Sequence, residues 1–478
     1  MSESALWTGL GLVAPLKARV SGAIPAGVGG LSIDTRTLSP GDLFFAIKGE
    51  NSDGHNYLSA AFEKGASACV VDEAHASDLG GSGSLYVVRD VLSSLEDLGR
   101  AARARTSARI VAVTGSVGKT GTKEALRLVF AAIGPTHASV ASYNNHWGVP
   151  LTLARMPRES RFGVFEIGMN HAGEITPLVA MVRPHVALVT IVAPVHLEFF
   201  DSVDSIARAK AEIFSGLEAG GTAIVNHDNA QYDIMVEAAR QSPAGQVLSF
   251  GAHEAADARL LDCEPDESGS LVTADILGTR MRYRLGAPGR HMAMNSLAVL
   301  LAAQAAGVSV REACEALQHF VPPVGRGECS TLVSPTGPFT LIDESYNANP
   351  VSMRAALSLL GQAPKASKGR RIAVLGDMLE LGGNSPVLHR ELADDIASNR
   401  VDMVYAAGPQ MKHLFDALPR RRQGVWRPSS AELEAPLAET IAAGDIVMVK
   451  GSNGSRMGAI VKTLKSRFAP DASVERGA

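Results

Sequence analysis

The run RIVAVTGSVGKT at residues 109–120 joins an apolar, β-branched stretch to a loop that contains two glycines. Residues 109–113 are typical of a buried strand, and a helical pattern follows from about residue 119 to 133. A strand, a glycine loop and a helix N-terminus in this order form a cradle for phosphates. Glycines let backbone N–H groups close around the anion, and the helix end adds positive potential.

In such a loop the lysine reaches the β- and γ-phosphates and the hydroxyl after it faces Mg²⁺. This loop departs from the general pattern at Val113, where a glycine is usual, and is the shorter GxxGKT version. The alternative is a glycine-rich turn with a surface lysine. We predict that nucleotide phosphates bind to Gly115, Ser116, Gly118, Lys119 and Thr120.

Further β-type runs alternate with helical patterns on both sides of this loop. Such alternation implies βαβ units and parallel sheets, whose ligands bind at the carboxyl ends of the strands. We predict an α/β fold with a small N-terminal α/β domain, a central phosphate-loop domain with a mostly parallel sheet, and a Rossmann-like C-terminal domain. The other predicted strands are 43–47, 163–167, 186–192, 222–226, 371–375, 401–407 and 445–450.

The length of 478 residues also fits about three domains. A basic, polar segment at 101–109 and a Pro/Gly-rich segment at 321–328 mark the predicted boundaries. They divide the chain into an N-terminal domain (1–105), a central domain (106–325) and a C-terminal domain (326–478).

Composition argues against several classes of protein. The net charge of −4 argues against a nucleic-acid-binding protein. The start of the chain lacks a secretory signal, and the apolar runs are too short to span a bilayer, so we expect no membrane insertion. The four scattered cysteines have no CxxC spacing and thus form no zinc or redox motif. We therefore expect a cytoplasmic protein, and a monomer.

The helical pattern at 205–217 carries a lysine on its apolar stripe. Lys210 lies seven residues after Val203 and completes that stripe. A lysine on a buried face is costly unless it is paired or modified, and burial lowers its pKa. Either Lys210 snorkels to solvent, or its amine has a function as a nucleophile or as a carbamate that binds metal.

Two further polar residues follow predicted strands. Glu166 lies at the end of strand 163–167, and His196 follows strand 186–192. Both are expected at the rim where the phosphate loop opens. Because Mg²⁺ prefers oxygen ligands, Glu166 suits it together with Thr120, whereas His196 is a less usual ligand. Each residue alone fits an ordinary strand end, but their coincidence favours a metal site.

Additional runs occur along the chain, at SIDTR (32–36), PGDLFF (40–45), SYNNHWGVPLTL (142–153), HLE (196–198), AKAEIF (209–214), DESYNANP (343–350), GDMLELG (376–382) and VKGS (449–452). In kind and order they resemble those of the Mur ligase family. Four of them, SIDTR, PGDLFF, SYNANP and GDMLELG, are similar to its MurF-type branch. The resemblance spans all three predicted domains and is far more specific than the phosphate loop alone.

The resemblance implies an ATP-dependent amide ligase. ATP would phosphorylate the terminal carboxylate of UDP-N-acetylmuramoyl-tripeptide, and the amine of D-alanyl-D-alanine would attack the acyl phosphate. Thr120 and Glu166 would bind one Mg²⁺, while His196 and a carbamylated Lys210 would bind a second. With Lys119 these form the implied catalytic set. The scheme is physically sound, because cations must neutralise two anions that approach each other.

The resemblance also implies binding roles, although each of these residues has a simpler alternative as a turn cap or a loop-ordering group. The nucleotide would contact Asn295, Arg326 and Asp343. The UDP end would contact Ser32, Asp34, Thr35 and Arg36. The sugar-peptide would contact Asn144 and Asn145, and the dipeptide would lie near Tyr346, Asn347 and Asn349. Because these contacts lie on both sides of the Pro/Gly-rich joint, we expect the last domain to close onto ATP.

The sequence departs from the family's usual residues at Ser142, Phe199, Ala211, Met292 and Glu344. None of these positions carries an assigned chemical role. Three alternatives stay open: a sister ligase that adds the third amino acid, an inactive relative that binds nucleotide or precursor, and a simple kinase. The lack of an Asn-Pro-Arg motif in the last domain disfavours the sister that adds a diamino acid. The two further domains disfavour the kinase.

Overall fold

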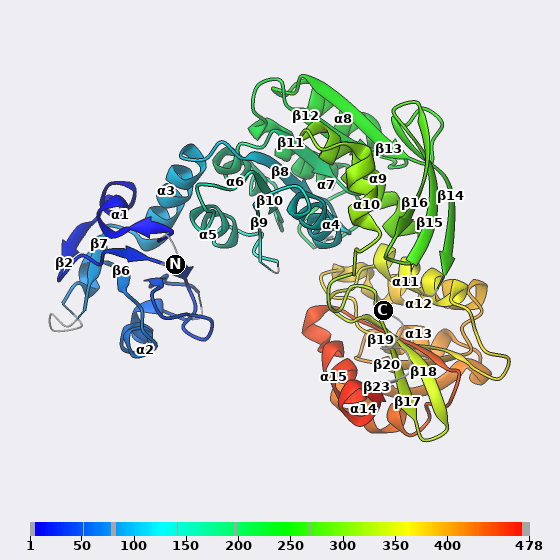
Figure 1. The fold of residues 1–478 in the computed structure, drawn as a ribbon. Helices are drawn as coiled ribbons and strands as arrows, with labels where there is room; N and C mark the ends of the chain where they lie inside the picture. The colour runs from blue at the N-terminus through cyan, green and yellow to red at the C-terminus, as the bar shows by residue number, and fades with distance from the viewer. Residues whose placement is uncertain are drawn as a thin grey trace.

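The computed structural model describes residues 5–50, 52–77, 83–140, 142–195, 198–266 and 269–470. Its strands form four sheets, and each sheet takes its strands from one part of the chain. An N-terminal unit lies at one end of the molecule, and a C-terminal unit lies beside the opposite end of the central unit (Figure 1). The predicted α/β architecture is therefore confirmed.

The N-terminal unit contains a five-stranded sheet, a short strand pair and three helices. In sheet order the strands are β2 (Arg19–Ser21), β7 (Leu85–Val88), β6 (Ala68–Asp72), β5 (Leu43–Phe45) and β4 (Leu31–Ser32). The pair is β1 (Trp7–Thr8) with β3 (Gly27–Val28), and the helices are α1 (Gly9–Leu16), α2 (Leu58–Glu63) and α3 (Val91–Ala104).

Helix α3 connects this unit to the central one. Arg103 near its end is only 5% exposed and donates to the carbonyls of Val182 and Arg183, at 2.8 Å each. Trp7 donates its ring N–H to the Ala154 carbonyl at 2.9 Å. The two units are thus joined by buried hydrogen bonds as well as by the chain.

The central unit is built on a nine-stranded sheet, and one of its inner strands leads into the phosphate loop. In sheet order its parallel part comprises β9 (Thr136–Ala138), β10 (Phe162–Glu166), β8 (Arg109–Thr114), β11 (Val186–Val189), β12 (Thr222–Asn226) and β13 (Gln246–Gly251). The sheet continues through β14 (Ala258–Asp266), β15 (Gly269–Ile276) and β16 (Thr279–Leu285), which pair with one another antiparallel.

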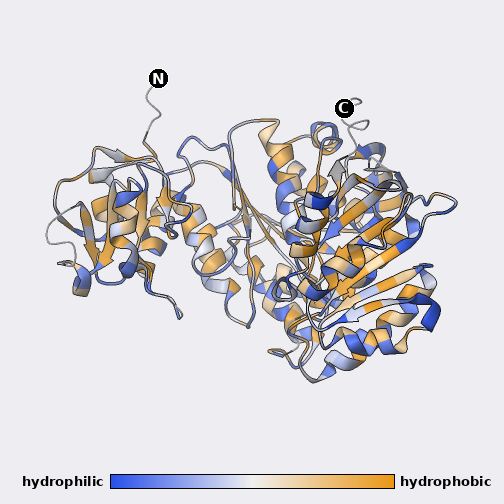
Figure 2. Cartoon of the chain, turned by 90° about the horizontal axis from the view of Figure 1, so that it is seen from below, coloured by the Kyte–Doolittle hydropathy of each residue, from blue (hydrophilic) through white to orange (hydrophobic). Residues whose placement is uncertain are grey.

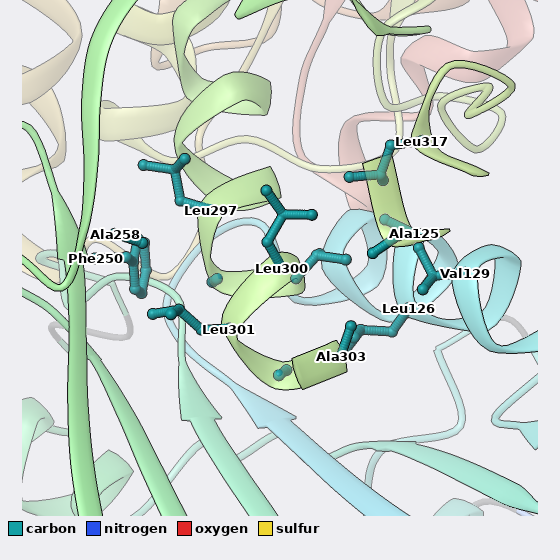
Figure 3. Close-up of a cluster of buried hydrophobic side chains, with 14 of the residues drawn as sticks. Ala125, Leu126, Val129, Phe250, Ala258, Leu297, Leu300, Leu301, Ala303 and Leu317 are labelled. Atoms are coloured by element: carbon teal, nitrogen blue, oxygen red, sulfur yellow. The ribbon is translucent and has the colours of Figure 1, made fainter. Parts of the chain in front are cut away.

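Residues of β8 alternate between two hydrophobic cores, one on each face of the sheet. Val111 and Val113 face the core of α4 (Lys119–Ala131), α9 (Arg290–Ala305) and α10 (Val310–Leu317). Figure 3 shows Leu297, Leu300 and Leu301 of α9 packed between the sheet and these neighbouring helices. Ile110 and Ala112 face a second core, which contains residues of α5 (Gly148–Ala154), α6 (Ile175–Val182), α7 (Val203–Ala211), η3 (Glu212–Gly216) and α8 (Tyr232–Arg240).

The C-terminal unit has a seven-stranded sheet with a hydrophobic core on each face. Figure 2 shows hydrophobic colour along strands and hydrophilic colour in loops and on parts of the helices. The strands in sheet order are β21 (Gln423–Arg427), β20 (Met403–Ala407), β19 (Arg371–Gly376), β22 (Ile446–Lys450), β18 (Gly337–Glu344), β17 (Glu328–Ser334) and β23 (Ala469–Pro470). The helices are α11 (Pro350–Gln362), α12 (Ser385–Ser398), α13 (Met411–Ala417), α14 (Ser430–Ala438) and α15 (Met457–Arg467).

All the predicted strands coincide with observed strands, although several of their ends differ. The predicted strand 186–192 ends at Val189, because the next residues bend to bind the phosphate loop. Thr190 donates its hydroxyl to the Val117 carbonyl at 2.6 Å, and the Ile191 carbonyl accepts from Ser116 N at 2.7 Å. Among the residues described, no helix has both the length and the apolar content needed to cross a bilayer.

The packing of α9 yields a stability prediction. Leu300 is 0% exposed in the core between α9 and the sheet. Replacing it with alanine removes buried methyl groups and leaves a cavity, so Leu300→Ala should lower the free energy of unfolding by about 2–5 kcal/mol. Chemical unfolding measures this change.

The matched control is Val387→Ala on α12, because Val387 is 53% exposed and buries little surface. That change should stay within about 0.5 kcal/mol. Equal losses in the two variants would contradict this description of the core.

Candidate active site

The phosphate loop runs from the end of β8 into the first turn of α4. Gly115 and Gly118 have φ angles of 146° and 87°, which side chains rarely adopt. A Cβ on Gly115 would lie 2.0 Å from Thr190 Oγ1, and one on Gly118 would lie 2.7 Å from Asn295 Nδ2. Both positions thus require glycine, and Asn295 of α9 lies directly against the loop.

Lys119 folds back over this loop instead of pointing into solvent. Its Nζ donates to the Gly115 carbonyl at 2.7 Å, and the side chain is part-buried. Burial lowers the pKa of Lys119; the charge of Glu166 opposes this shift, and the charge of Arg326 adds to it. The surface-lysine alternative therefore does not fit the structure.

A buried carboxylate connects the loop to a second segment of the central unit. Glu166, at the end of β10, is 1% exposed, and its Oε2 accepts from the Thr120 hydroxyl at 2.8 Å. Its Oε1 accepts from Asn144 Nδ2 at 2.7 Å. Thr120 and Glu166 thus place two oxygen groups side by side, which is the ligand type that Mg²⁺ prefers.

Lys210 occupies the buried face of α7, as its position on the apolar stripe predicts. The residue is 2% exposed, and no hydrogen bond or ion pair joins its amine to any residue in the described ranges. Burial lowers the pKa of Lys210 well below its usual value, and the charge of Lys119 lowers it further. The snorkelling alternative is excluded by this burial. His196 lies outside the described residues.

A cavity of about 510 Å³ opens between the central and C-terminal units. It brings together most of the residues that the sequence singled out for nucleotide, metal and dipeptide. From the central unit it is lined by Ser116, Gly118, Lys119, Thr120, Asn144, Glu166 and Asn295, and from the C-terminal unit by Arg326, Tyr346, Asn347 and Asn349.

Several of these residues also have local structural partners. Asn349 caps α11 by accepting from Ser352 N at 2.9 Å, and Asn347 Oδ1 accepts from Ala348 N at 2.9 Å. Asp343 is 2% exposed and is not one of the residues that line the cavity. It accepts hydrogen bonds from the hydroxyl of Ser345 at 2.6 Å and from Gly325 N at 3.2 Å. Asp343 therefore orders the joint between the two units.

The cavity is also lined by polar residues that no site assignment from the sequence included, among them Ser142, Asn170, His291, Glu344 and Lys450. Lys450 is 2% exposed, and its Nζ donates to Glu344 Oε2 at 3.2 Å and to the Asn347 carbonyl at 3.0 Å. Burial lowers the pKa of His291; Glu344 opposes this shift and Lys450 reinforces it. The VKGS and DESYNANP runs carried a signal for Lys450 and Glu344, since both lie within them.

The four N-terminal candidates form a turn away from this cavity. The hydroxyl of Ser32 donates to the Asp34 carbonyl at 2.9 Å, and Lys64 Nζ donates to the Thr35 carbonyl at 2.7 Å. Arg36 Nη2 pairs with Asp34 Oδ2 at 2.7 Å, and this hydrogen bond lowers the pKa of Asp34.

The central unit approaches this turn through α5 and through the loop at 142–147, which is called the substrate loop because the sequence predicts sugar-peptide contacts there. Arg155, which follows α5, donates Nε to the Leu31 carbonyl at 2.8 Å. A Cβ on Gly49 would lie 3.0 Å from Trp147 Cη2. Asn145 is exposed and accepts from the backbone N–H groups of Trp147 and Gly148, at 3.2 and 2.9 Å, so it shapes the start of α5.

Family models match three consecutive parts of the chain. A model described as Mur ligase family, catalytic domain, matches residues 27–115. The Mur ligase middle domain matches residues 113–303, and the Mur ligase, glutamate ligase domain, matches residues 325–453.

Individual relatives match over nearly their whole length. The UDP-N-acetylmuramoyl-tripeptide–D-alanyl-D-alanine ligase of Escherichia coli (strain K12) is 33% identical, over 91% of this chain and 93% of that protein. The enzyme of the same name from Rickettsia prowazekii is 31% identical, over 90% and 94%. The crystal structure of MurF from Acinetobacter baumannii superposes with a TM-score of 0.82 at 29% identity, over 96% of this chain and 98% of that one. On these similarities, the chain belongs to the Mur ligase family.

Proposed function

We propose that this chain is an ATP-dependent ligase that joins D-alanyl-D-alanine to UDP-N-acetylmuramoyl-tripeptide. Its products are ADP, phosphate and the pentapeptide precursor of peptidoglycan. The observation that carries the proposal is the shared cavity, in which the phosphate loop of one unit faces Arg326 and the DESYNANP residues of the other. Relatives that carry this enzyme name match more than nine-tenths of their own length.

The reaction proceeds in two balanced steps. First, the terminal carboxylate of the tripeptide attacks the γ-phosphorus of ATP, and the bond to the β-phosphate oxygen breaks to release ADP. Next, the amine of the dipeptide attacks the carbonyl carbon of the acyl phosphate, loses a proton and expels inorganic phosphate. In this proposal Lys119 and Arg326 offset the negative charges that meet in the first step, and the cavity holds the reacting groups in line.

The donor atoms of the site fit Mg²⁺. The Thr120 hydroxyl and the Glu166 carboxylate would hold one ion, because both are oxygen ligands and lie 2.8 Å apart beside the loop. His196 and Lys210 would hold a second. Bound Mg²⁺ supplies positive charge that neutralises the phosphates and the substrate carboxylate.

The surroundings of the Lys210 amine support the proposal of a carbamate there. The amine is buried, has no partner among the residues described, and is subject to the positive charge of Lys119. A neutral amine adds to CO₂ and loses one proton, which gives a carbamate anion in place of the neutral amine. That anion suits a divalent cation far better than an ammonium group does.

The remaining assignments complete the proposal. The turn of Ser32, Asp34, Thr35 and Arg36 would bind the UDP end, and Asn144 and Asn145 would bind the sugar-peptide. Asn295, Arg326 and Asp343 would bind the nucleotide, while Tyr346, Asn347 and Asn349 would bind the dipeptide.

Domain boundaries at 105/106 and 325/326, a monomeric state and a cytoplasmic location belong to the same proposal. The first boundary falls between α3, which ends at Ala104, and β8, which begins at Arg109.

The direct test is phosphate release from ATP and Mg²⁺ with UDP-linked tripeptide, with and without D-alanyl-D-alanine. We expect release to depend on the dipeptide and mass spectrometry to detect a pentapeptide product. Turnover only with the dipeptide precursor and a diamino acid would identify the sister ligase instead. Nucleotide binding without turnover on any acceptor would identify a sensor.

A second prediction concerns Lys210. The variant Lys210→Ala should lose activity by about two orders of magnitude or more, because one stabiliser of the transition state is removed. Arg208→Ala is the matched control, since Arg208 lies exposed on the same helix. Near-normal turnover of Lys210→Ala would exclude the metal role. For the modification itself, ¹³C-labelled bicarbonate should give a carbamate carbon signal in the wild type and none in Lys210→Ala.

A further inference from the structure

One hydroxyl group joins the substrate loop of the central unit to two residues of the C-terminal unit. Ser142 Oγ accepts a hydrogen bond from the Tyr346 hydroxyl at 2.9 Å and another from Arg326 Nη2 at 3.3 Å. A hydroxyl oxygen has two lone pairs and can accept both bonds at once. The two donors also contact each other, since the Arg326 guanidinium lies 4.0 Å from the centroid of the Tyr346 ring.

The substrate loop that carries Ser142 is itself fixed to the phosphate-binding helix. Asn144, two residues further on, donates to Glu166, and the same carboxylate accepts from Thr120 in the first turn of α4. A continuous series of contacts therefore leads from the C-terminal unit through the substrate loop to the phosphate loop.

The backbone around the two donor residues, Arg326 and Tyr346, is itself hydrogen-bonded. Tyr346 N donates to the Gly325 carbonyl at 3.1 Å, and Gly325 N donates to the buried carboxylate of Asp343 at 3.2 Å. These hydrogen bonds join the segment that carries Arg326 to the segment that carries Tyr346. Where the two donor residues meet the central unit, the hydrogen-bond acceptor is the side chain of Ser142.

We propose that Ser142 is a positioning residue that docks the C-terminal unit onto the substrate loop and so places Arg326 and Tyr346 at the cavity. It contributes no reacting group. Docking of this kind is a gating step, in which closure of one unit completes the site. The inference rests on the proposed function for its choice of substrates, but its geometry is independent of that choice.

Removing the acceptor hydroxyl of Ser142 should weaken ATP binding more than it slows the chemical step. In Ser142→Ala we expect kcat/KM for ATP to fall about threefold to tenfold, the range for loss of ordinary hydrogen bonds. Most of the change should be in KM, because saturating nucleotide restores the docked state. Ser142→Thr keeps the hydroxyl and should keep kcat/KM near the wild-type value. A merely structural role would lower the melting temperature of Ser142→Ala without this split between KM and kcat.

A double-mutant cycle with Tyr346→Phe tests the bond itself. Tyr346→Phe removes only the donor hydroxyl. The fall in kcat/KM that it causes should therefore largely disappear in a protein that already carries Ser142→Ala. Additive losses in the cycle, or a Ser142→Ala variant with wild-type kcat/KM for ATP, would overturn the proposal.

The ATP affinities of four proteins, measured by calorimetry, separate this inference from the proposed function. The four are the wild type, Ser142→Ala, Tyr346→Phe and the double variant. A wild type that binds ATP but forms no pentapeptide would defeat the proposed ligase activity. Non-additive ATP affinities among the four proteins would still support the docking role of Ser142, and additive affinities would reject it.

Discussion

The buried carboxylate of Glu166 holds the central unit's functional segments in one place. A carboxylate with 1% exposure is costly to bury unless its oxygens are hydrogen-bonded. Here each oxygen has a donor from a different segment, the Thr120 hydroxyl from α4 and the Asn144 amide from the substrate loop. The parallel pairing of β10 with β8 makes this possible, because it places Glu166 beside Val113, just before the phosphate loop. The phosphate loop and the loop that carries Asn144 are therefore tied to one buried carboxylate.

The C-terminal unit supplies the other half of the site, and its joint is organised by a second buried carboxylate. Asp343 binds the backbone of Gly325 and the side chain of Ser345. Gly325 and Gly327 have φ angles of 76° and 104°, so the backbone of the joint depends on glycine. This arrangement presents Arg326 and Tyr346 to the cavity on one surface. A site divided between two units can admit two large substrates and then close around them, which suits a reaction whose acyl phosphate must be kept from water.

Strand positions and the phosphate loop could be predicted from the sequence because they depend on local patterns. Apolar runs bounded by polar residues located every strand that was predicted. The position of Lys210 on an apolar stripe indicated a buried helix face, but the pattern left open whether its amine reaches solvent, and the structure buries the residue. The antiparallel strands β14 to β16 were not anticipated. Strand β14 carries alternating charges, such as Glu264 and Asp266, and is mostly exposed beyond Leu260, so it lacks the apolar run of a buried strand.

Contacts between the units were not predicted either. Ser142 and Tyr346 lie 204 residues apart, and no local pattern indicates that their hydroxyls meet.

In the proposed reaction the tripeptide carboxylate becomes an acyl phosphate, and oxygen labelling follows the carboxylate oxygen that bonds to phosphorus. The terminal carboxylate of the UDP-linked tripeptide is enriched in ¹⁸O and turned over with ATP and D-alanyl-D-alanine, and the released phosphate is analysed by mass spectrometry. Because the carboxylate oxygen that attacks phosphorus leaves with the phosphate, one ¹⁸O atom is expected in each phosphate formed. Pentapeptide formation with unlabelled phosphate would contradict the account.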